Sequence, residues 1–75
     1  MDLAEQALLE PRMKSLVALT ALVTLDRIEE FEEQVLRDLD GGLAASDVLE
    51  ALLELADLGI RVSPRAYELV RAHIV

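Results

Sequence analysis

The side chain most able to do chemistry in this sequence is an acid set among apolar residues. Glu54 stands between Leu53 and Leu55 in a leucine-rich stretch. Burial of a carboxyl group favours its protonated form, which suits a general acid. The sequence leaves two positions open for Glu54, one buried and the other at the edge of an apolar face.

Other catalytic arrangements are missing from the sequence. It contains no cysteine and a single histidine, His73, which we expect to be solvated at a helix end, so thiolate and Ser-His chemistry are excluded. Di-iron sites need histidine three residues after a glutamate, and this spacing is absent after Glu29, Glu30, Glu32 and Glu33. The Gly41–Gly42 pair follows a predicted helix, whereas a phosphate loop precedes one. We therefore predict no metal site and no cofactor.

The charge balance excludes several classes of partner. Fifteen acidic residues against seven basic ones give a net charge of -8, whereas binding to nucleic acid depends on Lys and Arg. The longest apolar run, Leu16–Leu25, is about half the roughly 20 residues that a membrane-spanning helix needs. The opening "MDLAEQ" lacks the basic region of a secretory signal. We expect a soluble, cytoplasmic protein whose charge suits a basic protein partner or simply keeps it in solution.

Hydrophobic periodicity predicts a compact all-α bundle of four or five helices in a single domain. The expected helices cover residues 2–8, 11–24, 27–40, 46–58 and 64–74. Asp26 is expected to cap the third of these helices, with Glu29 completing a capping box. Ser63 followed by Pro64 is a strong start signal for the last helix.

The segment 11–24 differs from the others because it is apolar on every side. No charged residue occurs between Lys14 and Asp26. A helix of this kind is normally covered all round, yet a chain of 75 residues offers few neighbours to cover it. Association with further copies would supply the missing core. The predicted oligomer interface consists of Leu16, Val17, Leu19, Thr20, Leu22 and Val23.

The order of motifs along residues 9–75 is distinctive. Pro11 opens the apolar "SLVALTALVTL", which is followed by "VLRDLDGGL", "SDVLEALLELA" and "SPRAYELVRA". In this order the motifs resemble the carboxymuconolactone decarboxylase and alkylhydroperoxidase-D-like family, with Glu50 in the place of a family glutamate. The resemblance implies the helical core of that family and its assembly into trimers or hexamers through the apolar helices.

The resemblance does not carry the family's activity over. Peroxidase-type members have Cys-x-x-Cys-x-x-x-His where this chain has Arg27, Glu30 and Gln34, so thiol peroxidase chemistry is excluded. Decarboxylase-type members usually have His at the place of Gln34, and often His or Gln at the place of Glu54. If a site survives, these two residues would be its remnants. The turn "LGIRVSP" also carries extra residues relative to the family, which puts the pocket it helps to line in doubt.

The leading interpretation is a small homo-oligomer with a decarboxylase-like helical core that acts as a non-catalytic structural or protein-interaction module. A designed chain would show the same agreement between caps, turns and helix pattern. One alternative is a decarboxylase-like enzyme with Glu54 as general acid/base and Gln34 as its hydrogen-bond partner. Another is an acidic helical adaptor or antitoxin that binds a basic protein.

Overall fold

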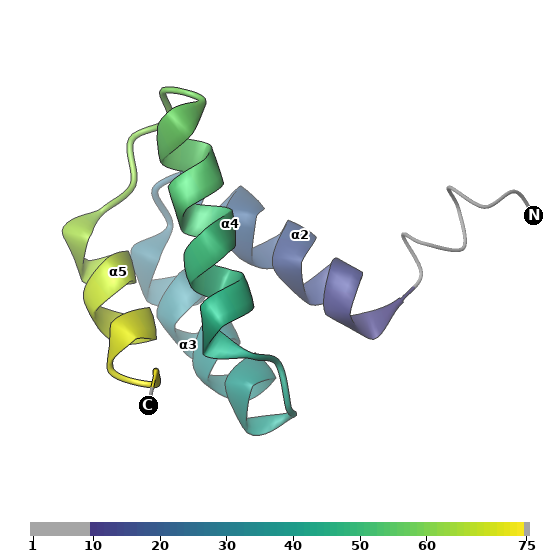
Figure 1. Ribbon diagram of the computed structural model, residues 1–75. Coiled ribbons are helices and arrows are strands. Elements are labelled where there is room, and N and C mark those ends of the chain that lie inside the picture. The colour runs from purple at the N-terminus through teal and green to yellow at the C-terminus, as the bar shows by residue number, and fades with distance from the viewer. Residues whose placement is uncertain (1–9, 75) are drawn as a thin grey trace, which may run out of the picture.

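The chain forms an all-helical bundle, as the periodicity predicts. The computed structural model describes residues 10–74 and contains four helices there (Figure 1): α2 (Pro11–Thr24), α3 (Ile28–Asp40), α4 (Ala45–Asp57) and α5 (Pro64–Arg71). No strand occurs within residues 10–74. The helix expected over 2–8 lies outside the described residues. α4 begins one residue before the expected position, and α5 ends three residues before it.

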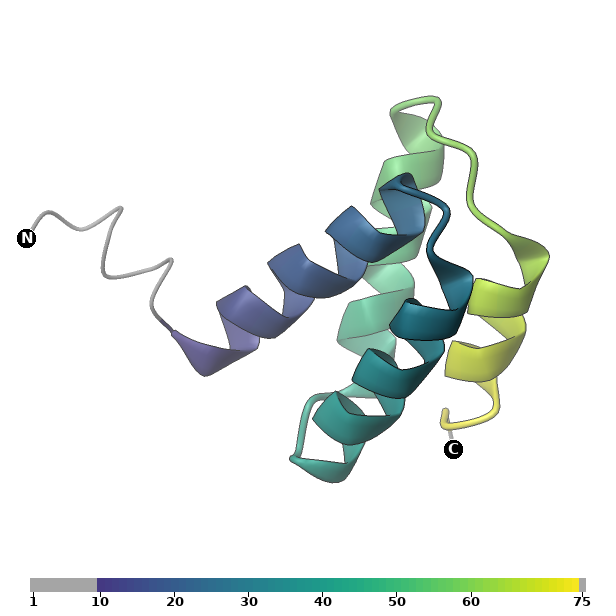
Figure 2. The same ribbon diagram turned by 180° about the vertical axis from the view of Figure 1, so that it is seen from behind.

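The helices form a ring of contacts in which α3 and α4 take diagonal places. α2 packs against both α3 and α4, and α5 packs against the same two helices from the other side. α3 and α4 run side by side with α5 in Figure 1, whereas α2 crosses them. The reverse view in Figure 2 shows that the first turns of α2 reach beyond the other three helices. Part of α2 is therefore covered on fewer sides than the rest of the bundle.

Each helix contributes two residues to a single core. Phe31 and Val35 of α3 are completely buried, and they lie one helical turn apart on its apolar face. The complete set of buried core residues is Leu19, Val23, Phe31, Val35, Val48, Leu52, Ala66 and Val70. None of the buried residues within 10–74 is polar or charged.

Asp26 ends α2, so the prediction that it caps α3 is wrong. Its φ is 59°, in the left-handed region, and its N–H donates to the carbonyl of Val23 at 3.0 Å. The N–H of Arg27 donates to the carbonyl of Leu22 at 2.9 Å. This pair of bonds is the Schellman motif, which satisfies the last carbonyls of a helix through one left-handed residue. Aspartate tolerates this conformation better than most residues, which explains its presence there.

The ends of α3 and α4 follow the same rule, with glycine at the left-handed position. Gly42 has φ 108° after α3, and Gly59 has φ 86° after α4. At the start of α5, the Ser63 hydroxyl accepts a hydrogen bond from the Arg65 N–H at 3.3 Å, and Pro64 follows the cap. The cap predicted at Ser63 is therefore confirmed.

Candidate functional site

The two residues predicted for catalysis lie on different helices and in different surroundings. Glu54 is exposed on α4, so of the two positions left open by the sequence the structure shows the outer one. Gln34 is half-buried on α3, the diagonal helix, and its side-chain N–H donates to Asp38 Oδ1 at 3.0 Å. Glu54 lines a groove with Arg12 and Leu16 of α2, in which Gln34 takes no part. Within one chain, the Gln34 side chain therefore donates its hydrogen bond to Asp38 and not to Glu54.

His73 and the acidic clusters do not assemble into a reactive group. His73 is exposed, and its Nδ1 lies 3.0 Å from the carbonyl of Leu69 in the preceding turn. Within residues 10–74, no group of three His, Asp or Glu side chains is placed to hold a metal ion. No helix in this part of the chain combines the length and the apolar character that a bilayer crossing requires.

The six residues predicted to form an oligomer interface divide into two groups. Leu19 and Val23 are 1% and 4% exposed in the core of their own chain, and Leu16 and Leu22 pack partly against that core. Thr20 is half-buried, whereas Val17 is 51% exposed. The chain therefore covers most of these positions itself and leaves Val17 to the solvent.

Val17 belongs to a larger uncharged surface that we call the outer face of α2. Met13, Val17, Ala21 and Leu25 follow one another at steps of four residues and share one side of the helix. All four are exposed, Leu25 to 66%. The sequence interpretation missed Met13, Ala21 and Leu25 as surface residues. The spacing of four from Val17 was the signal that could have found them.

Two threonines lie beside these residues and keep their hydroxyl groups within the helix. Thr20 Oγ1 donates to the carbonyl of Val17 at 2.9 Å, and Thr24 Oγ1 donates to the carbonyl of Thr20 at 2.7 Å. A hydroxyl group bonded in this way has already used its hydrogen atom. Another protein surface can therefore cover it without leaving a hydrogen-bond donor unpaired. The threonine methyl groups then extend the apolar character of the outer face of α2.

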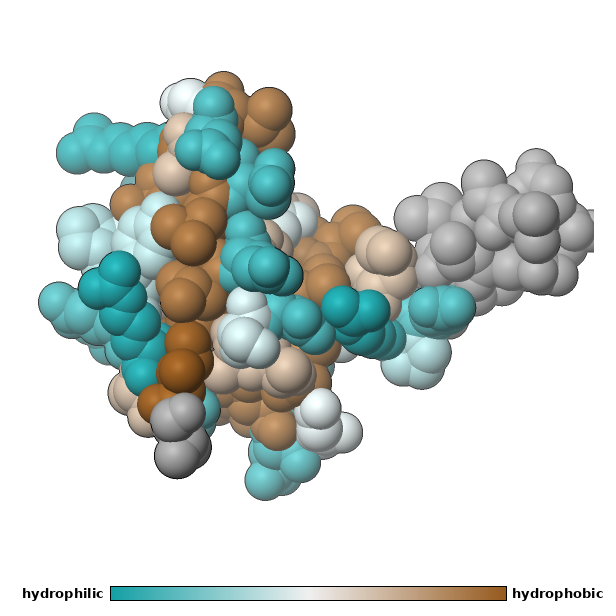
Figure 3. All heavy atoms as spheres, viewed as in Figure 1, coloured by the Kyte–Doolittle hydropathy of each residue, from teal (hydrophilic) through white to brown (hydrophobic). Residues whose placement is uncertain are grey.

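The outer side of α4 carries several acids beside an exposed leucine, Leu53. Glu50, Glu54 and Asp57 are exposed there, and α3 exposes Glu29, Glu30 and Glu33. Figure 3 shows apolar side chains on the surface over α4 and over α2, with polar residues of α4 between them. Acids are thus exposed on α3 and α4, whereas Met13, Val17, Ala21 and Leu25 of the outer face of α2 carry no charge.

Comparisons of the chain with protein-family models, with curated proteins and with solved structures found no match. The resemblance of residues 9–75 to the decarboxylase family is carried by its sequence motifs alone and stays a prediction. The geometry of residues 10–74 defines an all-α bundle with one unusually apolar helix surface.

Proposed function

We propose that the protein is a non-catalytic helical module that associates with copies of itself through the outer face of α2. The observation that carries this proposal is the uncharged surface formed by Met13, Val17, Ala21 and Leu25, with no charged residue between Lys14 and Asp26. Monomeric proteins rarely leave large contiguous apolar patches exposed. Covering such a surface is favourable by about 25 cal/mol for each Å² of apolar area. The sequence motifs suggest that this module has a decarboxylase-like core, and we place it in the cytoplasm.

A second copy in antiparallel orientation is the occupant that fits this surface best. Lys14 stands at the start of the outer face of α2, and Asp26 stands just beyond its end, both exposed. A two-fold axis crossing the outer face at the level of residues 19–20 would place Lys14 of each copy close to Asp26 of the other and Val17 against Ala21. A parallel pair would instead bring the two Lys14 side chains together. Antiparallel helices also oppose their macrodipoles, which adds to the preference.

The small side chains in the middle of this surface favour close contact between two helices. Ala18 and Ala21 are exposed near the proposed axis, and the larger Met13 and Leu25 lie toward its two ends. Close approach of the backbones in the middle would let these larger side chains fill the space at the ends. The surface is therefore complementary to its own copy in shape as well as in charge.

The experiment that tests this proposal is the mass in solution of two matched variants. Val17→Glu places a charge in the centre of the outer face of α2, whereas Leu36→Glu makes a similar change on α3, where Leu36 is 41% exposed. By light scattering, we expect the native chain and Leu36→Glu to have masses of at least twice the 8.3 kDa of one chain. Val17→Glu is expected to have the mass of one chain and to keep its helical circular dichroism.

Two outcomes would overturn the proposal. The first is a native chain that remains a single chain at about 1 mM, a concentration at which even weak specific association is detected. The second is an assembly that both variants weaken equally, because this would place the contact elsewhere or make it nonspecific.

An acidic adaptor is the second candidate, favoured by the exposed acids on the outer side of α4. A basic protein would bind there with an affinity that falls steeply as salt is added, because exposed charges are screened. Glu50→Gln combined with Glu54→Gln would weaken that binding, whereas Val17→Glu would leave it unchanged. The two candidates therefore respond to different substitutions.

A further inference from the structure

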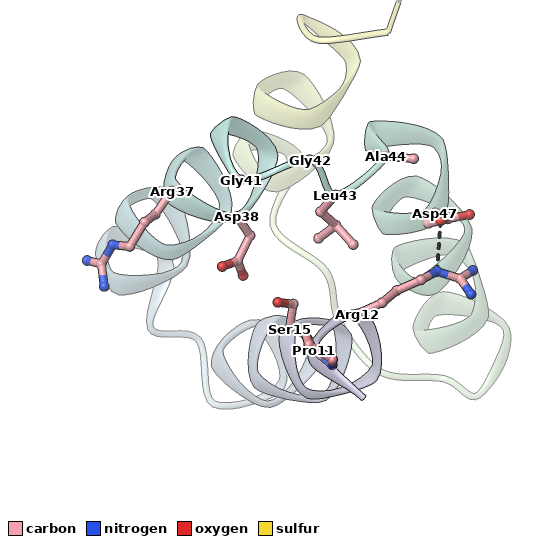
Figure 4. A pocket seen from close by; sticks show the side chains of 10 residues that line it. All are labelled: Pro11, Arg12, Ser15, Arg37, Asp38, Gly41, Gly42, Leu43, Ala44 and Asp47. Atoms are coloured by element: carbon pink, nitrogen blue, oxygen red, sulfur yellow. Dashed lines mark hydrogen bonds and ion pairs between the residues drawn. The ribbon is translucent and has the colours of Figure 1, made fainter. Parts of the chain in front are cut away.

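A cavity that the proposed function does not use lies between the start of α2 and the turn that joins α3 to α4. Its volume is about 370 Å³, and its walls include Ser15 of α2, Asp38 of α3 and Gly42 of the turn (Figure 4). Arg12 and Asp47 form an ion pair of 3.1 Å between Nε and Oδ2 at one side of it. Ser15 and Met13 point in nearly opposite directions around α2, so the cavity and the outer face of α2 are separate.

Asp38 lines this cavity and has one carboxylate oxygen without a partner. Its Oδ1 accepts the hydrogen bond from Gln34, whereas its Oδ2 is buried and accepts no hydrogen bond within the described part of the chain. Figure 4 shows the carboxylate directed into the cavity, with the Ser15 hydroxyl on the opposite wall. Buried polar atoms in folded proteins nearly always have a partner, so this oxygen indicates a missing donor.

The charges around the cavity favour a cation as that donor. Arg37 also belongs to the lining, but Figure 4 shows its guanidinium group turned away from the cavity. The other arginine of the lining, Arg12, is already paired with Asp47. Asp38 lies in the last turn of α3, where the negative end of the helix dipole adds to the charge of its carboxylate. A positive group in the cavity would therefore be attracted by both.

We propose that this cavity binds a small molecule or side chain that carries a primary ammonium group. Such a group has three N–H donors on one compact charge. On binding, a rotation of the Asp38 side chain brings its solvent-shielded Oδ2 to the ligand, and the ammonium group donates to it and to the Ser15 hydroxyl. The available donor set distinguishes it from a metal ion, because Ca²⁺ takes six or more oxygen ligands and Mg²⁺ demands near-octahedral coordination. Gln34 holds the Asp38 carboxylate in place and acts as a positioning residue.

The experiment is a titration of the ¹⁵N-labelled protein followed by its amide resonances. The probes are n-propylammonium and, in parallel, Nα-acetyl-lysine amide, which distinguish a free amine from a lysine side chain of a peptide. We expect saturable shifts centred on Ser15, Asp38 and Gly42 with at least one of these probes. The neutral analogue n-propanol is expected to cause no saturable shift at these residues.

Two variants of equal charge show whether the carboxylate is responsible. Asp38→Asn should weaken binding by about tenfold or more, because it removes the charge that accepts the hydrogen bond. Asp40→Asn changes an exposed acid on the same helix that does not line the cavity, so binding should stay within about twofold.

Several results would overturn the proposal. Equal weakening by both variants would show nonspecific attraction to an acidic protein. Equal shifts with n-propanol would show that the ammonium group is not recognised. An absence of saturable shifts with both cations up to about 50 mM would mean that water alone satisfies Asp38 Oδ2.

Discussion

α2 and α3 lie against each other, yet they divide apolar and charged residues in opposite ways. α3 buries Phe31 and Val35 on one side and exposes Glu29, Glu30 and Glu33 elsewhere. α2 buries Leu19 and Val23 on one side and exposes a second uncharged surface on the other. The first pattern suits a single chain, because water favours the mainly charged side that the core does not cover, and Leu36 is the large apolar residue of α3 exposed there. The second pattern leaves apolar area that one chain does not cover.

The turn between α2 and α3 also differs from the other turns in its backbone conformation. α3 and α4 are each followed by a glycine in the left-handed position, whereas α2 is followed by Asp26 in that position. The left-handed conformation costs glycine little and costs residues with a Cβ atom more. Of the Schellman turns within residues 10–74, only the one between α2 and α3 therefore carries backbone strain.

The largest expected effect compares the buried side of α3 with the exposed side of α2. Phe31→Ala empties a completely buried site and is expected to lower the free energy of unfolding by about 3–5 kcal/mol. This loss is comparable with the whole stability of a small domain, so the variant should be largely unfolded. Val17→Ala, by contrast, should change the free energy of unfolding of a single chain by less than about 0.5 kcal/mol.

Urea denaturation at low protein concentration measures both variants without a contribution from association. Equal losses for Phe31→Ala and Val17→Ala would show that α2 is not open on its outer side. At high protein concentration, Phe31→Ala should still be unfolded. The free energy of unfolding of Val17→Ala should then be lower than that of the native chain, because only this substitution weakens the proposed contact between copies.

How far the sequence predicts this fold depends on the range of the interactions involved. The all-α class and the Ser63 cap follow from neighbouring residues, and the structure confirms both. The role of Asp26 was predicted wrongly because aspartate suits both a helix N-cap and a left-handed helix end. Choosing between them depends on how α3 packs against α2, which the residues around Asp26 do not determine by themselves.

The candidate sites were harder to predict because they depend on how helices cross. The all-round apolar pattern of 11–24 indicates an exposed apolar surface, but it does not show which side the core takes. Asp38 escaped notice for a similar reason, since it is one acid among many on α3 until the start of α2 lies opposite it. Gln34 was singled out through the family resemblance for a role with Glu54, whereas its partner in the structure is Asp38.

A smaller effect is expected from Asp26→Gly at the joint between the two helices. Glycine adopts the φ of 59° without a clash of its Cβ atom, so the free energy of unfolding should rise by about 1 kcal/mol. Asp26→Ala should lower it, because alanine keeps the Cβ atom and lacks the polar side chain of aspartate. Thermal denaturation of the three chains gives the order Gly, Asp, Ala. If Asp26 instead capped α3, glycine would be slightly less stable than aspartate.

The smallest expected effect concerns the charged side of α3, where Glu32 pairs with Arg65 of α5 at 2.7 Å. The two side chains are 31% and 61% exposed, so water screens their attraction. A double-mutant cycle with Glu32→Gln and Arg65→Gln should give a coupling energy of about 0.5 kcal/mol that falls as salt is added. Both single variants should keep the mass of the native chain, because neither change touches the outer face of α2. A coupling above about 1.5 kcal/mol that is insensitive to salt would mean that this ion pair fixes the position of α5, and that α3 is held by its polar side as much as by Phe31 and Val35.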